Sequence, residues 1–221
     1  MDLLIFDLDG TLIDSQLDLA HSVNAARGHL GLAPLGHHII ATYVGNGSRV
    51  LIERAMGPGA DEFDIDRAHS FFLQYYRDHM LDHTRLYPGV REALDRFRDE
   101  GVAMAVLTNK PVRFSEGIIA GLGLTDHFFR VYGGNSFEQK KPHPMGVDAL
   151  IRESGAARER TLMIGDSGVD VKTARNAAIA VVGVAWGFQP EGFESDPPDV
   201  LVDEMEELVR WVLERRQAPA R

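Results

Sequence analysis

Two aspartates stand two residues apart, directly after a short apolar run near the start of the chain. Asp7 and Asp9 belong to the segment 7–11, Asp-Leu-Asp-Gly-Thr, which follows the apolar run 3–6. In extended backbone, residues two apart point to the same side, so both carboxylates can face one site. Clustered carboxylates repel each other unless a cation joins them, and oxygen ligands without histidine or cysteine suit Mg²⁺. An Asp-x-Asp-Gly segment alone is also typical of a plain turn.

Three further polar clusters follow later in the chain, close to other apolar runs. They contain, in chain order, Thr108 with Asn109, then Lys141, then Asp166 with Asp170. Taken singly, the second cluster could be a helix cap before a proline, and the lysine could be an ordinary surface residue. In an open parallel sheet, however, ligands bind at the carboxyl ends of the strands. We therefore expect all four clusters to meet at one sheet edge, as the groups of an active site do.

The elements that must position these side chains alternate between strand and helix. Short apolar runs predict buried parallel strands at 3–6, 102–107, 129–132, 161–164 and 180–184. Helical patterns are expected at 87–100, from 112 to 121 or 123, after 144, at 168–178 and at 203–215. This alternation predicts an α/β fold, a doubly wound parallel sheet of the Rossmann-like type with helices on both faces.

Residues 15–85 interrupt this alternation with an all-helical block. One helix should begin at the capping-box pattern of residues 15–18, a second near Ser48, and a third carries an aromatic stripe between 68 and 79. We expect a helical domain of residues 15–85, inserted into a core domain made of residues 1–14 and 86–221. Insertion at a loop tip is a tolerated way to add a module.

The composition of the 221-residue chain excludes several classes of protein. Hydrophobic residues make up 44% and charged residues 25%, as in globular proteins, and no apolar run reaches the ~18 residues of a membrane helix. The net charge of −10 argues against nucleic acid or a membrane as partner. The absence of cysteine excludes thiolate metal sites, and the absence of a signal pattern favours a cytoplasmic location. Residues 217–221 are expected to form a frayed tail. Oligomeric state is not predicted.

Together, the four clusters resemble the four motifs of the haloacid dehalogenase superfamily of phosphotransferases. The matching segments are 6–11, 107–109, 141–142 and 165–170, and the helical insertion is similar to the small cap domain of that family. Within the superfamily the chain is most similar to the phosphoglycolate phosphatases, through residues 43–48, 140–144 and 183–187. Two positions depart from their pattern: Asn135 replaces an acid after paired glycines, and Met145-Gly146 replaces a common Pro-Leu.

The resemblance implies an Mg²⁺-dependent phosphomonoester hydrolase that works through an aspartyl-phosphate. Asp7 would be the nucleophile, and Asp9 the general acid and base. The metal would be held by Asp7, Asp166 and the backbone carbonyl of Asp9. The groups that bind the transferring phosphate would be Gly10, Thr108, Asn109 and Lys141. Asp170 would orient Lys141 or a metal-bound water.

The expected partner is a small-molecule phosphate ester such as 2-phosphoglycolate. Asn46, Gly47 and Arg49 lie at a predicted helix start, where backbone N–H groups and a guanidinium could bind a carboxylate, unless the glycines only form a loop. A sugar-phosphate phosphatase, a pyrophosphatase or a phosphomutase remain alternatives. The mutase is disfavoured because all four lysines lie outside 15–85. A non-enzymatic phospho-acceptor signalling domain is the alternative from another class, but such domains are smaller.

Overall fold

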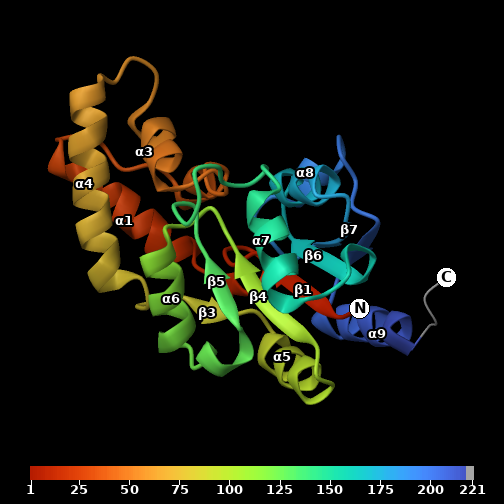
Figure 1. Ribbon diagram of the computed structural model, residues 1–221. Helices are drawn as coiled ribbons and strands as arrows, with labels where there is room; N and C mark the ends of the chain where they lie inside the picture. The colour runs from red at the N-terminus through yellow and green to blue at the C-terminus, as the bar shows by residue number, and fades with distance from the viewer. Residues whose placement is uncertain (218–221) are drawn as a thin grey trace.

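A six-stranded, fully parallel sheet forms the centre of the computed structural model, which describes residues 1–217 (Figure 1). Residues 218–221, and with them most of the expected tail, lie outside the described residues. The strand order is β5-β4-β1-β6-β7-β8. The strands are β1 (Leu3–Phe6), β4 (Ala103–Leu107), β5 (Arg130–Tyr132), β6 (Thr161–Gly165), β7 (Ala180–Val184) and β8 (Val200–Val202). The predicted doubly wound parallel fold is confirmed, whereas β8 was not predicted.

Helices cover both faces of this sheet. They are α5 (Val90–Asp99), α6 (Val112–Gly121), α7 (Met145–Ser154), α8 (Gly168–Asn176) and α9 (Met205–Gln217), with short 3₁₀ turns at Thr125–His127, Arg158–Arg160 and Pro190–Phe193. Alternate residues of β1 point to opposite faces. Leu4 and Phe6 therefore pack in the cluster that contains residues of α5 and α9, whereas Leu3 and Ile5 pack with α7 and α8. None of the described helices combines the length and apolar character needed to cross a bilayer.

The helical insertion forms a cap beside the carboxyl ends of the strands. Its helices are α1 (Gln16–His29), α2 (His37–Ala41), α3 (Ser48–Met56) and α4 (Glu62–His79), of which the short α2 was not predicted. The chain leaves the core through β2 (Ile13–Asp14) and returns through β3 (Arg85–Leu86), and these two strands pair antiparallel. Figure 1 shows α1, α3 and α4 gathered at one side of the sheet. We keep residues 15–85 as the proposed extent of the cap domain.

Helix α1 begins after Ser15, as predicted, but without the predicted capping box. The Ser15 hydroxyl donates instead to Oδ1 of Asp9 in the core, at 2.5 Å. The Asp18 carboxylate accepts hydrogen bonds from His83 and Thr84, at the far end of the insertion. Ser15 thus bonds a residue six positions earlier and Asp18 bonds residues 65 and 66 positions later, and both contacts compete with local capping of the helix.

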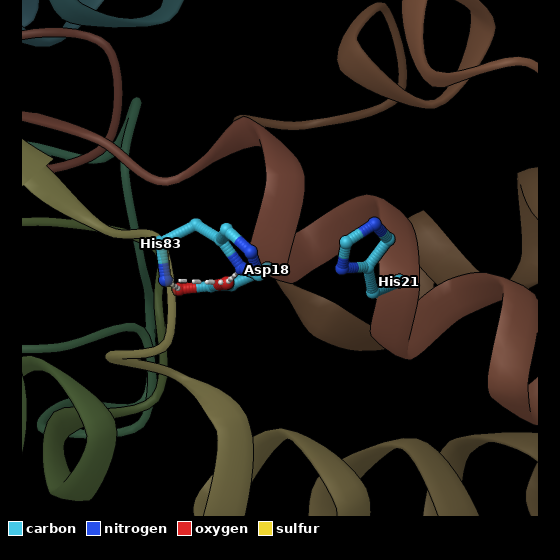
Figure 2. Close-up of side chains that lie close together, drawn as sticks. All are labelled: Asp18, His21 and His83. Atoms are coloured by element: carbon cyan, nitrogen blue, oxygen red, sulfur yellow. Dashed lines mark hydrogen bonds and ion pairs between the residues drawn. The ribbon is translucent and has the colours of Figure 1, made fainter.

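The Asp18 carboxylate fastens the start of the cap to its end (Figure 2). Its Oδ1 accepts from the backbone N–H of His83 at 3.0 Å, and its Oδ2 accepts from the N–H and the hydroxyl of Thr84, both at 2.8 Å. The His83 ring and the neighbouring His21 lie close enough for a three-residue metal site. The hydrogen bonds to both carboxylate oxygens account for the positions of Asp18 and His83 without a metal, and His21 packs edge-on against the His83 ring.

Replacing this buried carboxylate should lower the stability of the protein. In Asp18→Asn an amide group would face donors, so the free energy of unfolding should fall by about 2–3 kcal/mol at pH 7, measured by urea unfolding. Burial would raise the pKa of Asp18, but hydrogen bonds from His83 and Thr84 outweigh burial and hold that pKa below its usual value. The difference between wild type and variant should therefore shrink as the pH falls below ~4.

The matched control is Asp126→Asn, which changes an exposed aspartate in a short turn and should leave the free energy of unfolding unchanged. If Asp18→Asn protein is as stable as the wild type, the hydrogen bonds of Asp18 with His83 and Thr84 contribute nothing to the free energy of unfolding.

Candidate active site

The site lies where the order of the sheet changes direction. From β1 the chain proceeds outward through β4 and β5 on one side, and through β6, β7 and β8 on the other. Such a switch opens a crevice at the carboxyl ends of the strands. Asp7 follows β1 and its N–H donates to the carbonyl of Ile164 at 2.9 Å, while Thr108 follows β4 and bonds Tyr132 at 3.0 Å. Sheet hydrogen bonding thus continues up to the first site residues.

A pocket between core and cap contains most of the predicted site residues. Its polar floor is supplied by the core through Asp7, Asp9, Thr108, Asn109, Lys110 and Asp166. Its walls from the cap include Gly47, Ser48, Leu51, Phe72 and Tyr76. Three of the four polar clusters, those of Asp7, Thr108 and Asp166, therefore meet in this pocket, beneath a largely apolar wall from the cap. Such a pocket suits a small ligand with one strongly charged end.

Lys141 is buried and held between two carboxylates. Its Nζ lies 2.9 Å from Oδ1 of Asp7 and 2.7 Å from Oδ1 of Asp170. The second oxygen of Asp170 accepts from the N–H and the hydroxyl of Ser167, in a capping box that starts α8. Burial would lower the pKa of Lys141, but the two carboxylates outweigh it and raise that pKa. The ammonium is thus charged and fixed beside Asp7.

Three buried acids crowd this part of the pocket. Carboxylate oxygens of Asp7, Asp166 and Asp170 lie within 4.8 Å of one another. Burial, and then the charge of Asp170, raise the pKa of Asp7 to about 6 against the opposing effect of Lys141. Burial and the other two acids also raise the pKa of Asp166 well above its usual value. One lysine does not neutralise this charge, and an all-oxygen donor set of this kind fits a hard divalent cation such as Mg²⁺.

Gly10 allows the loop after β1 to approach the acids closely. Its φ is +83°, and a Cβ at this position would lie 2.1 Å from Oδ2 of Asp166. Only glycine fits such backbone beside a carboxylate. The structure therefore gives this residue a packing reason of its own, and its role in binding phosphate stays a prediction.

Thr108 and Asn109 are both buried at the end of β4. The Asn109 amide nitrogen donates to the carbonyls of Gly45 in the cap, at 2.9 Å, and of Lys141, at 3.0 Å. Its oxygen finds no hydrogen-bond partner among the described residues. The Thr108 hydroxyl accepts from the N–H of Lys110 at 3.3 Å. Asn109 thus links three segments of the site, while phosphate binding by either side chain stays a prediction.

Lys110 is a site residue to which the sequence assigned no role. Its Nζ lies 2.9 and 3.0 Å from the two carboxylate oxygens of Asp9, and 4.6 Å from the centre of the Tyr76 ring. Burial would lower the pKa of Lys110, but the charge of Asp9 outweighs it and raises that pKa. Its position directly after Thr108-Asn109, in a chain with only four lysines, was the available signal.

The cap candidates fare differently from one another. Gly47 lies at the pocket and precedes α3, as expected of a helix start facing a ligand. The Arg49 guanidinium does not reach the pocket, because it pairs on the surface with three acids. These are Glu53, Glu62 and Asp66, at 3.0, 2.5 and 2.6 Å. The carbonyl of Asn46 accepts from Lys140 at 2.7 Å. This geometry gives no support to the expected contact of Arg49 with a substrate.

Comparison with known proteins agrees with this geometry. The family model for haloacid dehalogenase-like hydrolases matches residues 4–184. A phosphoglycolate phosphatase of Agrobacterium fabrum is 36% identical, covering 96% of this chain and 93% of its own, and one of Chromobacterium violaceum is 40% identical, covering 83% and 84%. A crystal structure described as a predicted phosphoglycolate phosphatase from Haemophilus somnus superposes with a TM-score of 0.90 at 32% identity, covering 96% and 97%.

The chain therefore belongs to the haloacid dehalogenase-like hydrolase family. The resemblance carried by its four motifs is confirmed. Within that family it is an enzyme of the phosphatase class, as its curated relatives are.

Proposed function

We propose that this phosphatase is an Mg²⁺-dependent phosphomonoesterase that hydrolyses 2-phosphoglycolate, or a closely similar small carboxylated ester, through an aspartyl-phosphate. The observation that carries the chemistry is the position of Asp7. Asp7 directly follows the central strand β1, at the point where the strand order of the sheet changes direction. Its carboxylate lines the pocket and lies 2.9 Å from the Lys141 ammonium. The names of the curated relatives support the substrate.

The reaction divides a difficult hydrolysis into two displacements. An oxygen of Asp7 attacks phosphorus, and the bond from phosphorus to the leaving oxygen breaks. Asp9 gives a proton to that oxygen, and then takes one from the water that hydrolyses the aspartyl-phosphate. Lys141, held by Asp170, provides positive charge where the transferring oxygens accumulate negative charge. Two observations support these roles: Asp7 and Asp9 line the same pocket, and the Lys141 ammonium lies 2.9 Å from Oδ1 of Asp7.

The metal would be held by the carboxylates of Asp7 and Asp166 and by the backbone carbonyl of Asp9. When bound, Mg²⁺ neutralises phosphate charge and favours in-line geometry. Asp170 is close to the same acids, but both of its oxygens bond Lys141 and Ser167. Its proposed task is therefore to hold Lys141.

The cap supports a small, anionic leaving group. Ser48, the first residue of α3, and Gly47, which precedes it, line the pocket. Backbone N–H groups at a helix start attract anions. The remaining cap wall is largely apolar, with Leu51 and Phe72. A glycolate carboxylate could bind at the start of α3. A larger sugar would instead place its hydroxyl groups against the apolar part of the cap wall.

A substrate panel tests this proposal. With Mg²⁺ present, kcat/KM for 2-phosphoglycolate should exceed that for glucose 6-phosphate and for pyrophosphate by at least about tenfold, the scale of one well-placed charged hydrogen bond. A higher kcat/KM for a sugar phosphate or pyrophosphate would reject the substrate but keep the chemistry. Accumulation of an isomerised sugar phosphate instead of inorganic phosphate would indicate a mutase.

A further inference from the structure

The Lys110 ammonium lies between the two domains, in contact with one charged group and one ring. On the core side it bonds both carboxylate oxygens of Asp9, and on the cap side it lies over the face of Tyr76 in α4. Asp9 receives one more donor, the Ser15 hydroxyl at the start of the cap. The carboxylate is thus held by Lys110 of the core and by Ser15 at the start of the cap.

The backbone of Lys110 is fixed in the core by two hydrogen bonds. Its carbonyl accepts from Gly134 at 2.9 Å, and its N–H donates to the Thr108 hydroxyl. Tyr76, by contrast, comes from the cap, where its ring stacks on Phe72 at 5.4 Å between centroids. The same ring meets the core edge-on at Phe114 of α6, at 5.3 Å. The face of Tyr76 can therefore cover Lys110 only while the cap lies against the core.

This arrangement makes the ion pair sensitive to the position of the cap. An ammonium over an aromatic face gains attraction that grows when water is excluded, and a buried ion pair attracts more strongly than a hydrated one. Without the ring, water would reach Lys110, and the side chains of the pair would have more conformations available.

We propose that Lys110 is a positioning residue for Asp9, and that Tyr76 locks Lys110 when the cap closes, so that the acid–base carboxylate is fixed only in the closed enzyme. This inference rests on the proposed function, in which Asp9 transfers the proton. The proton moves between Asp9 and the leaving oxygen or water, and Lys110 keeps its own. In the open enzyme, where water reaches Lys110 and Asp9 is not fixed, turnover is thereby limited.

The test compares four variants and one control variant on 2-phosphoglycolate. Because general acid–base catalysis contributes about 10²–10⁴-fold, Lys110→Met should lower kcat by roughly 10–100-fold with KM changed less than about threefold. Lys110→Arg, which keeps the charge, should recover part of this loss. Tyr76→Leu should lower kcat by about tenfold, whereas Tyr76→Phe should behave like wild type, because the hydroxyl has no partner among the described residues. Lys172→Met, at an exposed position, is the control.

The double variant Lys110→Met/Tyr76→Leu decides whether the ring acts through the lysine. Its kcat should equal that of Lys110→Met alone, since residues acting through one contact are not additive. Independent, multiplying losses would overturn the lock. If Lys110→Met fails to fold, as judged by circular dichroism, the Tyr76→Leu and Tyr76→Phe pair in the Lys110→Arg background supplies the comparison.

Two further outcomes would overturn the inference. A raised KM for 2-phosphoglycolate with unchanged kcat, and no effect on p-nitrophenyl phosphate, would make Lys110 a ligand of the substrate carboxylate. A slow Asp9→Asn enzyme beside a fully active Lys110→Met enzyme would reject the positioning role but keep the proposed function. A fully active Asp9→Asn enzyme would instead reject the acid–base role in the proposed function itself.

Discussion

Asp7→Asn protein is expected to lose phosphatase activity by at least about four orders of magnitude in kcat, as enzymes do when a covalent nucleophile is removed. The amide has nearly the shape of the carboxylate, so the fold should be kept. It also removes one charge from a cluster in which burial and Asp170 raise the pKa of Asp7. Release of inorganic phosphate from 2-phosphoglycolate and from p-nitrophenyl phosphate measures the loss.

The two substrates separate nucleophilic chemistry from substrate recognition. Loss on both is the expected result, because both require transfer to the same oxygen. Asp126→Asn changes an exposed residue that does not line the pocket, so it serves as the control and should keep full activity. Asp7→Asn protein with more than trace turnover on either substrate would reject the covalent mechanism.

Removal of divalent metal is expected to abolish activity, and Mg²⁺ should restore it. Three buried carboxylates within 4.8 Å of one another, against one lysine, leave negative charge that a cation would balance. Ca²⁺ should inhibit, because it takes more ligands at longer distances than Mg²⁺. Protons compete with the metal for these oxygens, and the pKa of Asp7 is raised to about 6. The Mg²⁺ concentration for half-maximal activity should therefore rise as the pH falls through 6.

The measurement is activity in EDTA, followed by titration with Mg²⁺ at several pH values. Asp166→Asn should need a higher Mg²⁺ concentration than wild type, whereas Asp126→Asn should not. Undiminished activity in chelator would contradict the metal assignment directly.

The fold was predictable because burial on both faces leaves a plain mark in the sequence. Residues 3–6, Leu-Leu-Ile-Phe, are all fully buried, and a continuous apolar run between polar residues is typical of a central parallel strand. Strand β8 has three residues at the sheet edge, with Leu201 half exposed, so its pattern is too short and mixed to stand out.

The site was predictable where its residues follow strands, and less so where partners come from afar. Asp7, Thr108 and Asp166 could be placed together because parallel strands end at one edge. Asp18 bonds Thr84, 66 residues later in the chain, whereas the local spacing of Ser15 and Asp18 suggested a helix cap. Arg49 pairs with acids of α4, which no spacing rule for a single helix reveals.

Lys110 is a site residue whose contacts could not be predicted from the local sequence. Its position directly after Thr108-Asn109 was the one available signal, and no local pattern showed that this lysine would be buried. Its environment is made by Asp9, 101 residues earlier, and by Tyr76 of the cap. The fold of the core brings Asp9 to Lys110, and the packing of the cap on the core adds the Tyr76 ring.

The paired strands β2 and β3 have a consequence for how such enzymes diversify. Ile13 pairs with Leu86 and Asp14 with Arg85, so the insertion begins and ends one strand spacing apart, about 5 Å. A segment of almost any length can be grafted between neighbouring ends without moving the loops that hold Asp7 and Lys141. Mutation and recombination can therefore remodel the roof of the pocket while the core loops that hold Asp7 and Lys141 are inherited unchanged.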